Sequence, residues 1–165
     1  AWDLAPPAPG GGDSETGVAA RANGVGGVLL VFMPGTAEIN ELTSRLREGH
    51  LAERLWVLPL SAALPVEEQQ KCFVTTFPEG CTHKVVVATN VAETSVTIPD
   101  VSVVIDSCRE RRMTVDVHSN TPCLREQCCA LDALRQRRGR AGRTRPGVCF
   151  RLLRERELCE LEERP

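Results

Sequence analysis

The apolar positions of the chain form short, valine-rich runs that alternate with longer stretches of helical spacing. Short continuous apolar runs are typical of strands buried on both faces of a parallel sheet, and the stretches between them are typical of crossover helices. The predicted strands are residues 28–33, 55–58, 84–88, 101–105 and 148–152. The pattern therefore predicts an α/β fold, with a parallel sheet that carries helices on both faces.

Helix signals fill several gaps between these runs. A helix is predicted over residues 36–49, where Thr36 can cap the first turn and Gly49 ends the last. A second is predicted from Pro65, which suits a first turn, to about residue 75. A third is expected from residue 130 to about residue 140, with Cys128 and Cys129 either joining it or leading into it. Residues 93–100, ETSVTIPD, are polar and are expected to be irregular.

After the fourth predicted strand the pattern changes. Residues 111–117 alternate between polar and apolar, HSNT at residues 118–121 suits a turn, and residues 122–126 can return as a second strand. We therefore expect a β-hairpin inserted at this point.

The two ends of the chain lack the apolar pattern of the middle. Residues 1–27 hold seven of the thirteen glycines and three prolines, so we expect a flexible leader outside the fold. Residues 154–165 are charged and compatible with a helix, and we expect them to begin a C-terminal region. The folded domain is predicted to span residues 28–153.

The overall charge limits how the chain can bind nucleic acid. A formal net charge of -2 and a pI near 6.0 argue against binding through global positive charge, so any phosphate affinity must be local. The longest apolar run, residues 25–33, is short and broken by glycine, and nothing resembles a signal peptide or a membrane span. We expect an intracellular protein of the cytoplasm or nucleus with no membrane partner.

The cysteines and histidines show no spacing typical of a metal site. The eight cysteines include no CxxC pair, whereas a structural zinc site needs spaced pairs. The three histidines are scattered along the chain. We expect reduced, mostly buried thiols and no metal, with a redox role or metal binding as the alternatives.

Arginines cluster near the end of the third predicted helix. Six lie among the eleven residues 135–145, around QRRGRAGR at residues 136–143, where Gly139, Ala141 and Gly142 interrupt the run. Guanidinium groups spaced by small residues suit a polyphosphate, because each can bind two oxygens. A solvated basic face is the alternative. The position within an α/β chain favours arginines aimed at a cleft along the sheet edge.

Four segments together resemble one protein family. QRRGRAGR looks like motif VI of the DEAH-box RNA helicases, and ATNVAETSVTI at residues 88–98 looks like their motif V. VLLVFMPG at residues 28–35 is similar to motif IV, and EEQQKCF at residues 67–73 to the QQxxxF-like segment. The resemblance covers roughly residues 28–153. It implies the second RecA-like domain of such a helicase, a RecA-like parallel sheet with helices on both faces plus a β-hairpin between motifs V and VI.

The resemblance also implies an ATP site. Arg140 and Arg143 match arginine fingers that reach the terminal phosphate across a cleft, where they stabilise charge on the transferring group. Gln136 matches a glutamine that helps order the phosphate and the attacking water. Phe73 matches an aromatic that stacks on the adenine, and a core position in its helix is the alternative.

Motifs IV and V imply further contacts with nucleotide and RNA. Ser95 matches a serine that senses the nucleotide state, and Thr97 is expected near the ribose. At the ends of strands, short polar side chains and backbone groups can hold RNA phosphates, although the same residues also suit turns. The residues that match RNA contacts of the family are Pro34, Gly35, Thr89 and Asn90.

Parts of a complete helicase are missing from the chain. It contains no GxxxxGK[ST] loop and no DExH box. By resemblance these elements, the Mg²⁺ ligands and the general base belong to the first RecA-like domain, so Glu93 is expected to be structural. We expect a domain that is inactive alone and serves an ATP-dependent RNA helicase, an NTP hydrolase that uses ATP and Mg²⁺. Its expected partners are RNA, the first RecA-like domain, C-terminal accessory domains and a protein activator.

The chain departs from the family pattern in four places. Pro99 precedes the aspartate of motif V, Cys108 stands where glycine is common, CCALDALR at residues 128–135 replaces a serine- and alanine-rich stretch, and residues 109–124 diverge from the family hairpin. These differences support an alternative of another class, a helicase-derived scaffold that binds RNA or protein without hydrolysis. The complete QRRGRAGR segment argues against it.

Overall fold

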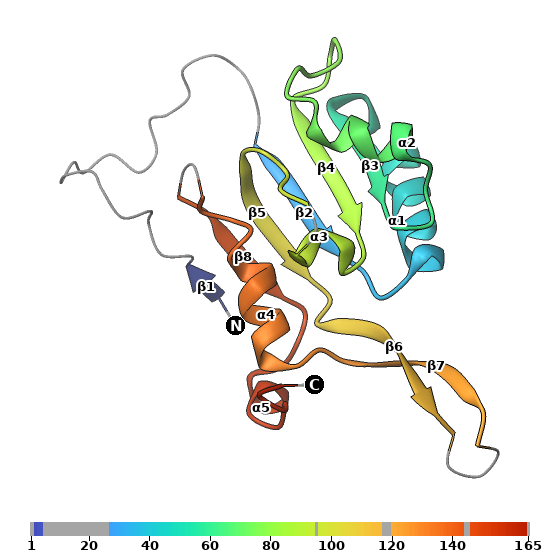
Figure 1. The fold of residues 1–165 in the computed structure, drawn as a ribbon. Helices are drawn as coiled ribbons and strands as arrows, with labels where there is room; N and C mark the ends of the chain where they lie inside the picture. Colours follow the sequence, from blue (N-terminus) through green and yellow to red (C-terminus); the bar gives the residue numbers. More distant parts are fainter. Residues whose placement is uncertain (1, 5–26, 95, 117–119, 144–145, 165) are drawn as a thin grey trace.

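A six-stranded sheet forms the centre of the computed structural model, which describes residues 2–4, 27–94, 96–116, 120–143 and 146–164 (Figure 1). The strand order is β1-β8-β5-β2-β4-β3, and all neighbours run parallel except β1, which is antiparallel to β8. The strands are β1 (Trp2–Leu4), β2 (Val28–Phe32), β3 (Leu55–Leu60), β4 (His83–Ala88), β5 (Val101–Asp106), β6 (Arg109–Val115), β7 (Pro122–Cys128) and β8 (Val148–Arg151). The helices are α1 (Thr36–Glu48), α2 (Val66–Gln70), α3 (Val91–Thr94), α4 (Leu131–Arg138) and α5 (Glu155–Leu158), with 3₁₀ turns η1 (Ala52–Arg54) and η2 (Lys71–Phe73).

The sheet is buried on both faces, which explains its valine-rich strands. In β2, Leu30 and Phe32 belong to the apolar cluster on one face, whereas Leu29 and Val31 belong to the cluster on the other. Successive side chains of a strand point to opposite faces, so a strand between two layers needs apolar residues at every position. All five strands predicted from the apolar runs are present.

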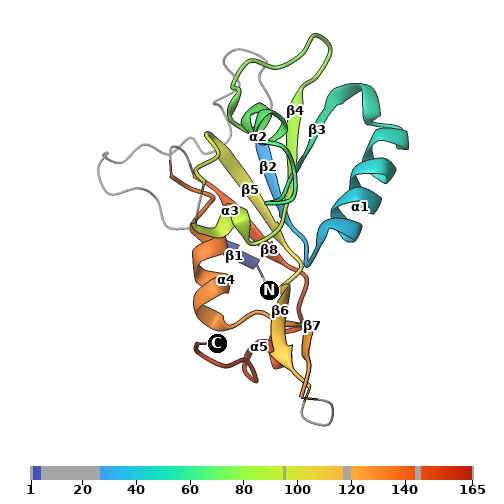
Figure 2. The same ribbon diagram turned by 45° about the vertical axis from the view of Figure 1, so that its right-hand side comes forward.

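Helices cover both faces of this sheet (Figure 2). Ile39 of α1 packs into the cluster that holds Val31 and Val57, while η2 and α3 contribute Cys72 and Ala92 to the larger cluster on the opposite face. Together with the hairpin described below, this arrangement confirms the predicted RecA-like fold class. No helix in the described part of the chain is long and apolar enough to cross a membrane.

The predicted hairpin is formed by β6 and β7 and projects from the carboxyl end of β5, away from the main sheet (Figures 1 and 2). Its antiparallel pairing runs from Arg109 opposite Cys128 to Val115 opposite Pro122. Cys128 therefore ends a strand and does not join the third predicted helix. Residue 117, the predicted end of the first strand, and residues 118 and 119 of the expected turn lie outside the described residues.

The second predicted helix is shorter than expected. The α-helix ends at Gln70, and the chain continues as a 3₁₀ turn only to Phe73, instead of to about residue 75. The Lys84 ammonium donates hydrogen bonds to the carbonyls of Cys72 and Val74 at 2.6 and 2.7 Å. These two carbonyls are therefore bound by a side chain from β4 and not by a further turn of helix.

Two other local expectations are corrected. Thr36 is the first residue of α1 and not its cap, because Gly35 occupies the cap position in an extended conformation with no side-chain cap bond. The segment 93–100 begins inside the short helix α3 and is not irregular throughout.

Both ends of the chain contribute to the fold. Trp2–Leu4 pair with β8 at the sheet edge. The prediction of a leader outside the fold is therefore wrong for these three residues. Residues 1 and 5–26 lie outside the described residues. At the other end, Leu158 and Leu161 pack against the cluster that contains Cys129 and Leu134. The charged tail thus contains the short helix that its sequence allows, and it packs beside α4.

Candidate functional site

The candidate RNA-contacting residues lie together at the carboxyl edge of the sheet. Pro34 and Gly35 follow β2, while Thr89 and Asn90 follow its parallel neighbour β4. A backbone hydrogen bond of 2.8 Å from residue 33 to residue 88 joins the two strand ends. The edge therefore presents polar groups from two adjacent strands, with Asn90 exposed.

An ion pair ties the hairpin to this edge. Arg111 of β6 donates to the Glu38 carboxylate in the first turn of α1 at 2.7 Å. The Arg111 guanidinium lies against Gly35, where a Cβ would collide with it and stand 2.9 Å from Glu38 Oε2. Glycine at this position leaves the space that Arg111 occupies.

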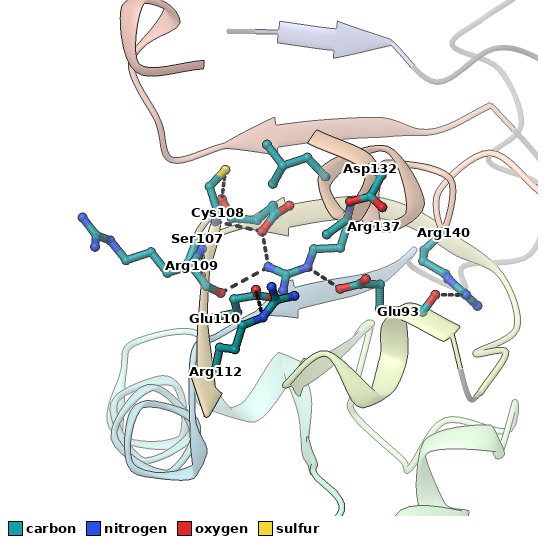
Figure 3. Close-up of polar contacts among 12 residues, drawn as sticks. Glu93, Ser107, Cys108, Arg109, Glu110, Arg112, Asp132, Arg137 and Arg140 are labelled. Atoms are coloured by element: carbon teal, nitrogen blue, oxygen red, sulfur yellow. Dashed lines mark hydrogen bonds and ion pairs between the residues drawn. The ribbon is translucent and has the colours of Figure 1, made fainter. Parts of the chain in front are cut away.

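Arg137 of α4 lies at the centre of a buried ionic network (Figure 3). Its side chain is 1% exposed, and it donates from Nε to Glu93 Oε2 at 3.0 Å and from Nη1 to Asp106 Oδ1 at 2.9 Å. Nη1 also donates to the Arg109 carbonyl at 3.3 Å, and the guanidinium lies 4.9 Å from the centroid of the Phe32 ring. One side chain thereby joins α4 to α3, to the end of β5 and to the start of the hairpin.

The charges in this network compensate one another. Burial disfavours the charged guanidinium of Arg137, but the Asp106 carboxylate and the hydrogen bonds to Asp106 and Glu93 together outweigh burial and keep the pKa of Arg137 above its usual range. Burial raises the pKa of Glu93, and its hydrogen bond to Arg137 partly offsets the rise. Asp106 also accepts the Cys108 N–H at 2.8 Å. Glu93 is engaged by Arg137, which agrees with the structural role expected for it.

Arg140 follows α4 and reaches back to the motif V segment (Figure 3). It donates from Nη1 to the Val96 carbonyl at 3.0 Å and from Nη2 to the Glu93 carbonyl. Its Nε is buried and has no hydrogen-bond partner among the described residues. Burial and the neighbouring charge of Arg143 lower the pKa of Arg140, whereas Glu93 acts in the opposite direction. A partly desolvated guanidinium with an unused N–H therefore stands beside a second positive charge.

Arg143 and Thr97 complete a small recess with Arg140. Arg143 is exposed and donates from Nη1 to the Thr97 hydroxyl and from Nε to the Gly139 carbonyl, both at 3.3 Å. Gly142, with φ of 83°, supplies the left-handed turn directly before it. The recess is lined by Leu30, Ala92, Thr97, Ile98, Val101, Arg140 and Arg143. Two guanidinium groups and a hydroxyl beside apolar side chains suit an anionic ligand.

Phe73 and Gln136 are not among the residues that line this recess. Phe73 is half-buried at the end of η2 and packs against the apolar cluster on that face of the sheet. Gln136 is exposed on α4. Ser95 lies outside the described residues. The structure thus brings the arginine pair and the motif V hydroxyl together but does not place Phe73 among them.

Sequence reasoning did not single out three residues that hold this region together: Lys84, Asp106 and Arg137. Lys84 and Asp106 are buried in β4 and β5, strands that are otherwise almost entirely apolar. A charged residue inside such a strand needs a buried partner, which is the signal that could have identified both. Nothing in the sequence distinguishes Arg137 from the other five arginines of residues 135–145.

The cysteines form part of the apolar core. All eight are free, and Cys72, Cys108, Cys129 and Cys149 are buried. Burial raises the pKa of Cys72 to about 11 and that of Cys108 to about 12, so both remain thiols at neutral pH. No group of three His, Cys, Asp or Glu side chains in the described part of the chain is placed to hold a metal ion.

Comparison with known proteins relates the chain to helicases. Residues 19–145 match the family model described as helicase conserved C-terminal domain. The probable ATP-dependent RNA helicase DHX35 homolog of Caenorhabditis elegans is 44% identical over 136 residues, which cover 80% of this chain and 18% of that protein. ATP-dependent RNA helicase TDRD9 of Danio rerio is 42% identical over 127 residues, covering 77% of this chain and 9% of that protein.

A solved structure shows the same likeness in three dimensions. The crystal structure of the Escherichia coli DExH-box NTPase HrpB matches with a TM-score of 0.75 and 33% identity, over 84% of this chain and 17% of that chain. The chain therefore spans less than a fifth of the length of each of these proteins.

Proposed function

We propose that this chain, which belongs to the helicase conserved C-terminal domain family, supplies the second RecA-like half of the ATP and RNA sites in a DEAH-type RNA helicase. Its relatives are named as ATP-dependent RNA helicases. On this proposal the first RecA-like domain and the C-terminal accessory domains belong to the same longer protein, and a protein activator acts on the whole.

The recess formed by Arg140, Arg143 and Thr97 carries the proposal. Burial and the charge of Arg143 both lower the pKa of Arg140, and the two neighbouring cations repel each other. A terminal phosphate would relieve that repulsion and bind the exposed Arg143 guanidinium beside Arg140. Donors already in place before charge develops are what phosphoryl transfer requires of a protein. Both arginines therefore act as fingers when the first domain closes on this surface.

The remaining nucleotide contacts are proposed from the resemblance to the helicase motifs. Gln136, exposed on the finger helix, orders the phosphate and the attacking water. Phe73 presents its half-buried ring to the adenine, Thr97 lies beside the ribose, and Ser95 senses the nucleotide state. The residues that line the recess include cationic and hydroxyl donors, which suit a phosphate group chemically, but no carboxylate for Mg²⁺, so the metal ligands are proposed to come from the first domain.

RNA is proposed to cross the carboxyl edge of the sheet. Pro34 and Gly35 offer backbone groups at the end of β2, and Thr89 and Asn90 offer mainly their side chains at the end of β4, because the Thr89 N–H already donates to the Leu60 carbonyl at 3.2 Å. These contacts address phosphates and sugars, which position the strand without reading its sequence.

Replacing Asn90 with alanine is expected to weaken RNA binding about three- to tenfold, the loss expected for one hydrogen bond to a phosphate. Asn90 is exposed, and its backbone carbonyl, which accepts the Glu93 N–H at 2.9 Å, is unaffected by truncating the side chain. The measurement is fluorescence anisotropy of a labelled single-stranded RNA with the full-length protein at fixed salt. Asn40→Ala, at an exposed position on α1, is the control, and equal RNA affinity in the two variants would contradict the contact.

The activity itself is tested by phosphate release from ATP by the full-length protein, with and without RNA. We expect hydrolysis that RNA stimulates, and none from the 165-residue chain alone, which lacks a phosphate loop. A full-length protein that binds RNA but releases no phosphate would instead be the helicase-derived scaffold. The sequence preceding this chain gives an independent answer, because hydrolysis requires a phosphate loop and a DEAH box there.

A further inference from the structure

Lys84 is a buried cation whose contacts lie around a predicted nucleotide residue. Lys84 is one of only two lysines in the chain. It lies in β4 and is 1% exposed. Its ammonium donates to the Cys72 carbonyl at 2.6 Å and to the Val74 carbonyl at 2.7 Å. Those two carbonyls belong to the residues directly before and after Phe73.

Burying the Lys84 ammonium costs free energy, because the charge loses its contact with water. Burial lowers the pKa of Lys84, and the Asp100 carboxylate acts in the opposite direction. The ammonium also lies 5.0 Å from the centroid of the Trp56 ring. A methionine of similar length would fill the same apolar space without that penalty, so the carbonyl contacts account for a lysine here.

The contacts determine where the 3₁₀ turn ends. Val74 donates its N–H to the Lys71 carbonyl at 3.3 Å to close the turn, and its own carbonyl then binds the ammonium. Cys72 is fully buried beneath the turn, so the segment is attached to the sheet on both sides of Phe73. Positive charge near the carboxyl end of helical structure is also electrostatically favourable.

We propose that Lys84 is a positioning residue for nucleotide binding, which fixes the backbone on both sides of Phe73 so that its ring is held ready to stack on the base. The inference rests on the proposed adenine contact of Phe73. Lys84 itself touches no nucleotide. It acts by removing freedom from the turn, and a ring fixed before binding loses less entropy when the base arrives.

Lys84→Met in the full-length protein tests the role. The KM for ATP is expected to rise about three- to tenfold, the size of one aromatic stacking contact, while kcat at saturating ATP stays near wild type. Inorganic tripolyphosphate, which has no base, should inhibit ATP hydrolysis with an unchanged inhibition constant. Lys71→Met, which removes an exposed lysine paired only with Glu68 on the surface, is the matched control and should change neither value. General loosening of the domain would weaken tripolyphosphate as well, and that result would overturn the proposal.

A double-mutant cycle with Phe73→Ala separates the positioning role of Lys84 from the adenine contact of Phe73. In the Phe73→Ala background, Lys84→Met should add little to KM, because no ring remains to be positioned. If the two effects on KM multiply instead, the positioning role is wrong. If Phe73→Ala raises KM but Lys84→Met does not, the positioning role alone is wrong. If Phe73→Ala leaves KM unchanged, the adenine contact is wrong and the inference falls with it.

Lys84→Gln keeps the test decisive should the methionine variant fail to fold. Glutamine is neutral and carries an amide that can donate to one of the two carbonyls, so it is easier to bury. A smaller rise in the KM for ATP, with tripolyphosphate inhibition unchanged, is expected. Wild-type KM in a folded Lys84→Gln protein would overturn the proposal.

Discussion

Replacing Arg137 with methionine is expected to lower the free energy of unfolding by about 3 to 5 kcal/mol, the cost of leaving one side of a buried ion pair uncompensated. Asp106 and Glu93 would both lose the guanidinium that they bind at 2.9 and 3.0 Å. Asp106 is fully buried, so water cannot replace the lost partner without opening the fold. Urea unfolding of the chain, followed by tryptophan fluorescence, measures the change.

Two further variants show whether charge is the cause. Arg135→Ala removes an exposed arginine of the same helix, paired with Glu163 at the surface, and should change stability little. Adding Asp106→Asn to Arg137→Met removes the stranded charge while its oxygen can still accept the Cys108 N–H, so it should restore part of the loss. If Arg137→Met is no worse than Arg135→Ala, the network does not stabilise the domain.

The same network links elements that the proposed mechanism requires to move together. Arg137 lies three residues before Arg140 in the QRRGRAGR segment, and it binds both Glu93 of motif V and the Arg109 carbonyl at the start of the hairpin. Arg140 in turn binds the carbonyls of Glu93 and Val96. The finger segment cannot shift against motif V without breaking these contacts, so a phosphate bound at the fingers and RNA bound at the strand ends act on one connected body.

The central sheet could be predicted because burial on both faces leaves a clear pattern. Each strand from β2 to β5 is apolar at consecutive positions, and no other element in a chain of this size has that signature. The first strand could not be predicted in the same way. Three residues carry no periodicity, and Trp2–Leu4 become a strand only because β8, far along the chain, offers them an open edge.

The site was predictable in its parts but not in its arrangement. The resemblance to helicase motifs V and VI points to Arg140, Arg143 and Thr97, which the structure gathers in one recess. It does not distinguish Arg137, buried at 1% exposure, from its exposed neighbour Arg135, because burial depends on how α4 lies against α3 and β5. Long-range packing decides which arginine becomes part of the core and which remain available to a ligand.

Replacing Arg143 with alanine in the full-length protein is expected to lower RNA-stimulated kcat about a thousandfold, in the range known for arginine fingers. Arg143 is exposed, and the two hydrogen bonds that it makes to described residues are long, so the fold should survive. Arg143→Lys should recover little, because an ammonium keeps the charge but cannot bind two phosphate oxygens as a planar guanidinium does. Initial rates of phosphate release at saturating ATP and RNA measure the effect.

Arg140→Ala should lose turnover to a similar extent and should differ from Arg143→Ala in its response to RNA. Without Arg140 the carbonyls of Glu93 and Val96 lose their donors, so the motif V segment loosens beside the RNA-contacting strand end. We therefore expect weaker RNA binding in Arg140→Ala and unchanged RNA binding in Arg143→Ala. Arg135→Ala controls for the loss of a nearby positive charge and should keep wild-type turnover. Near-normal kcat in Arg143→Ala would show that Arg143 is not an arginine finger. Unchanged RNA affinity in Arg140→Ala would show that the motif V segment keeps its conformation without Arg140.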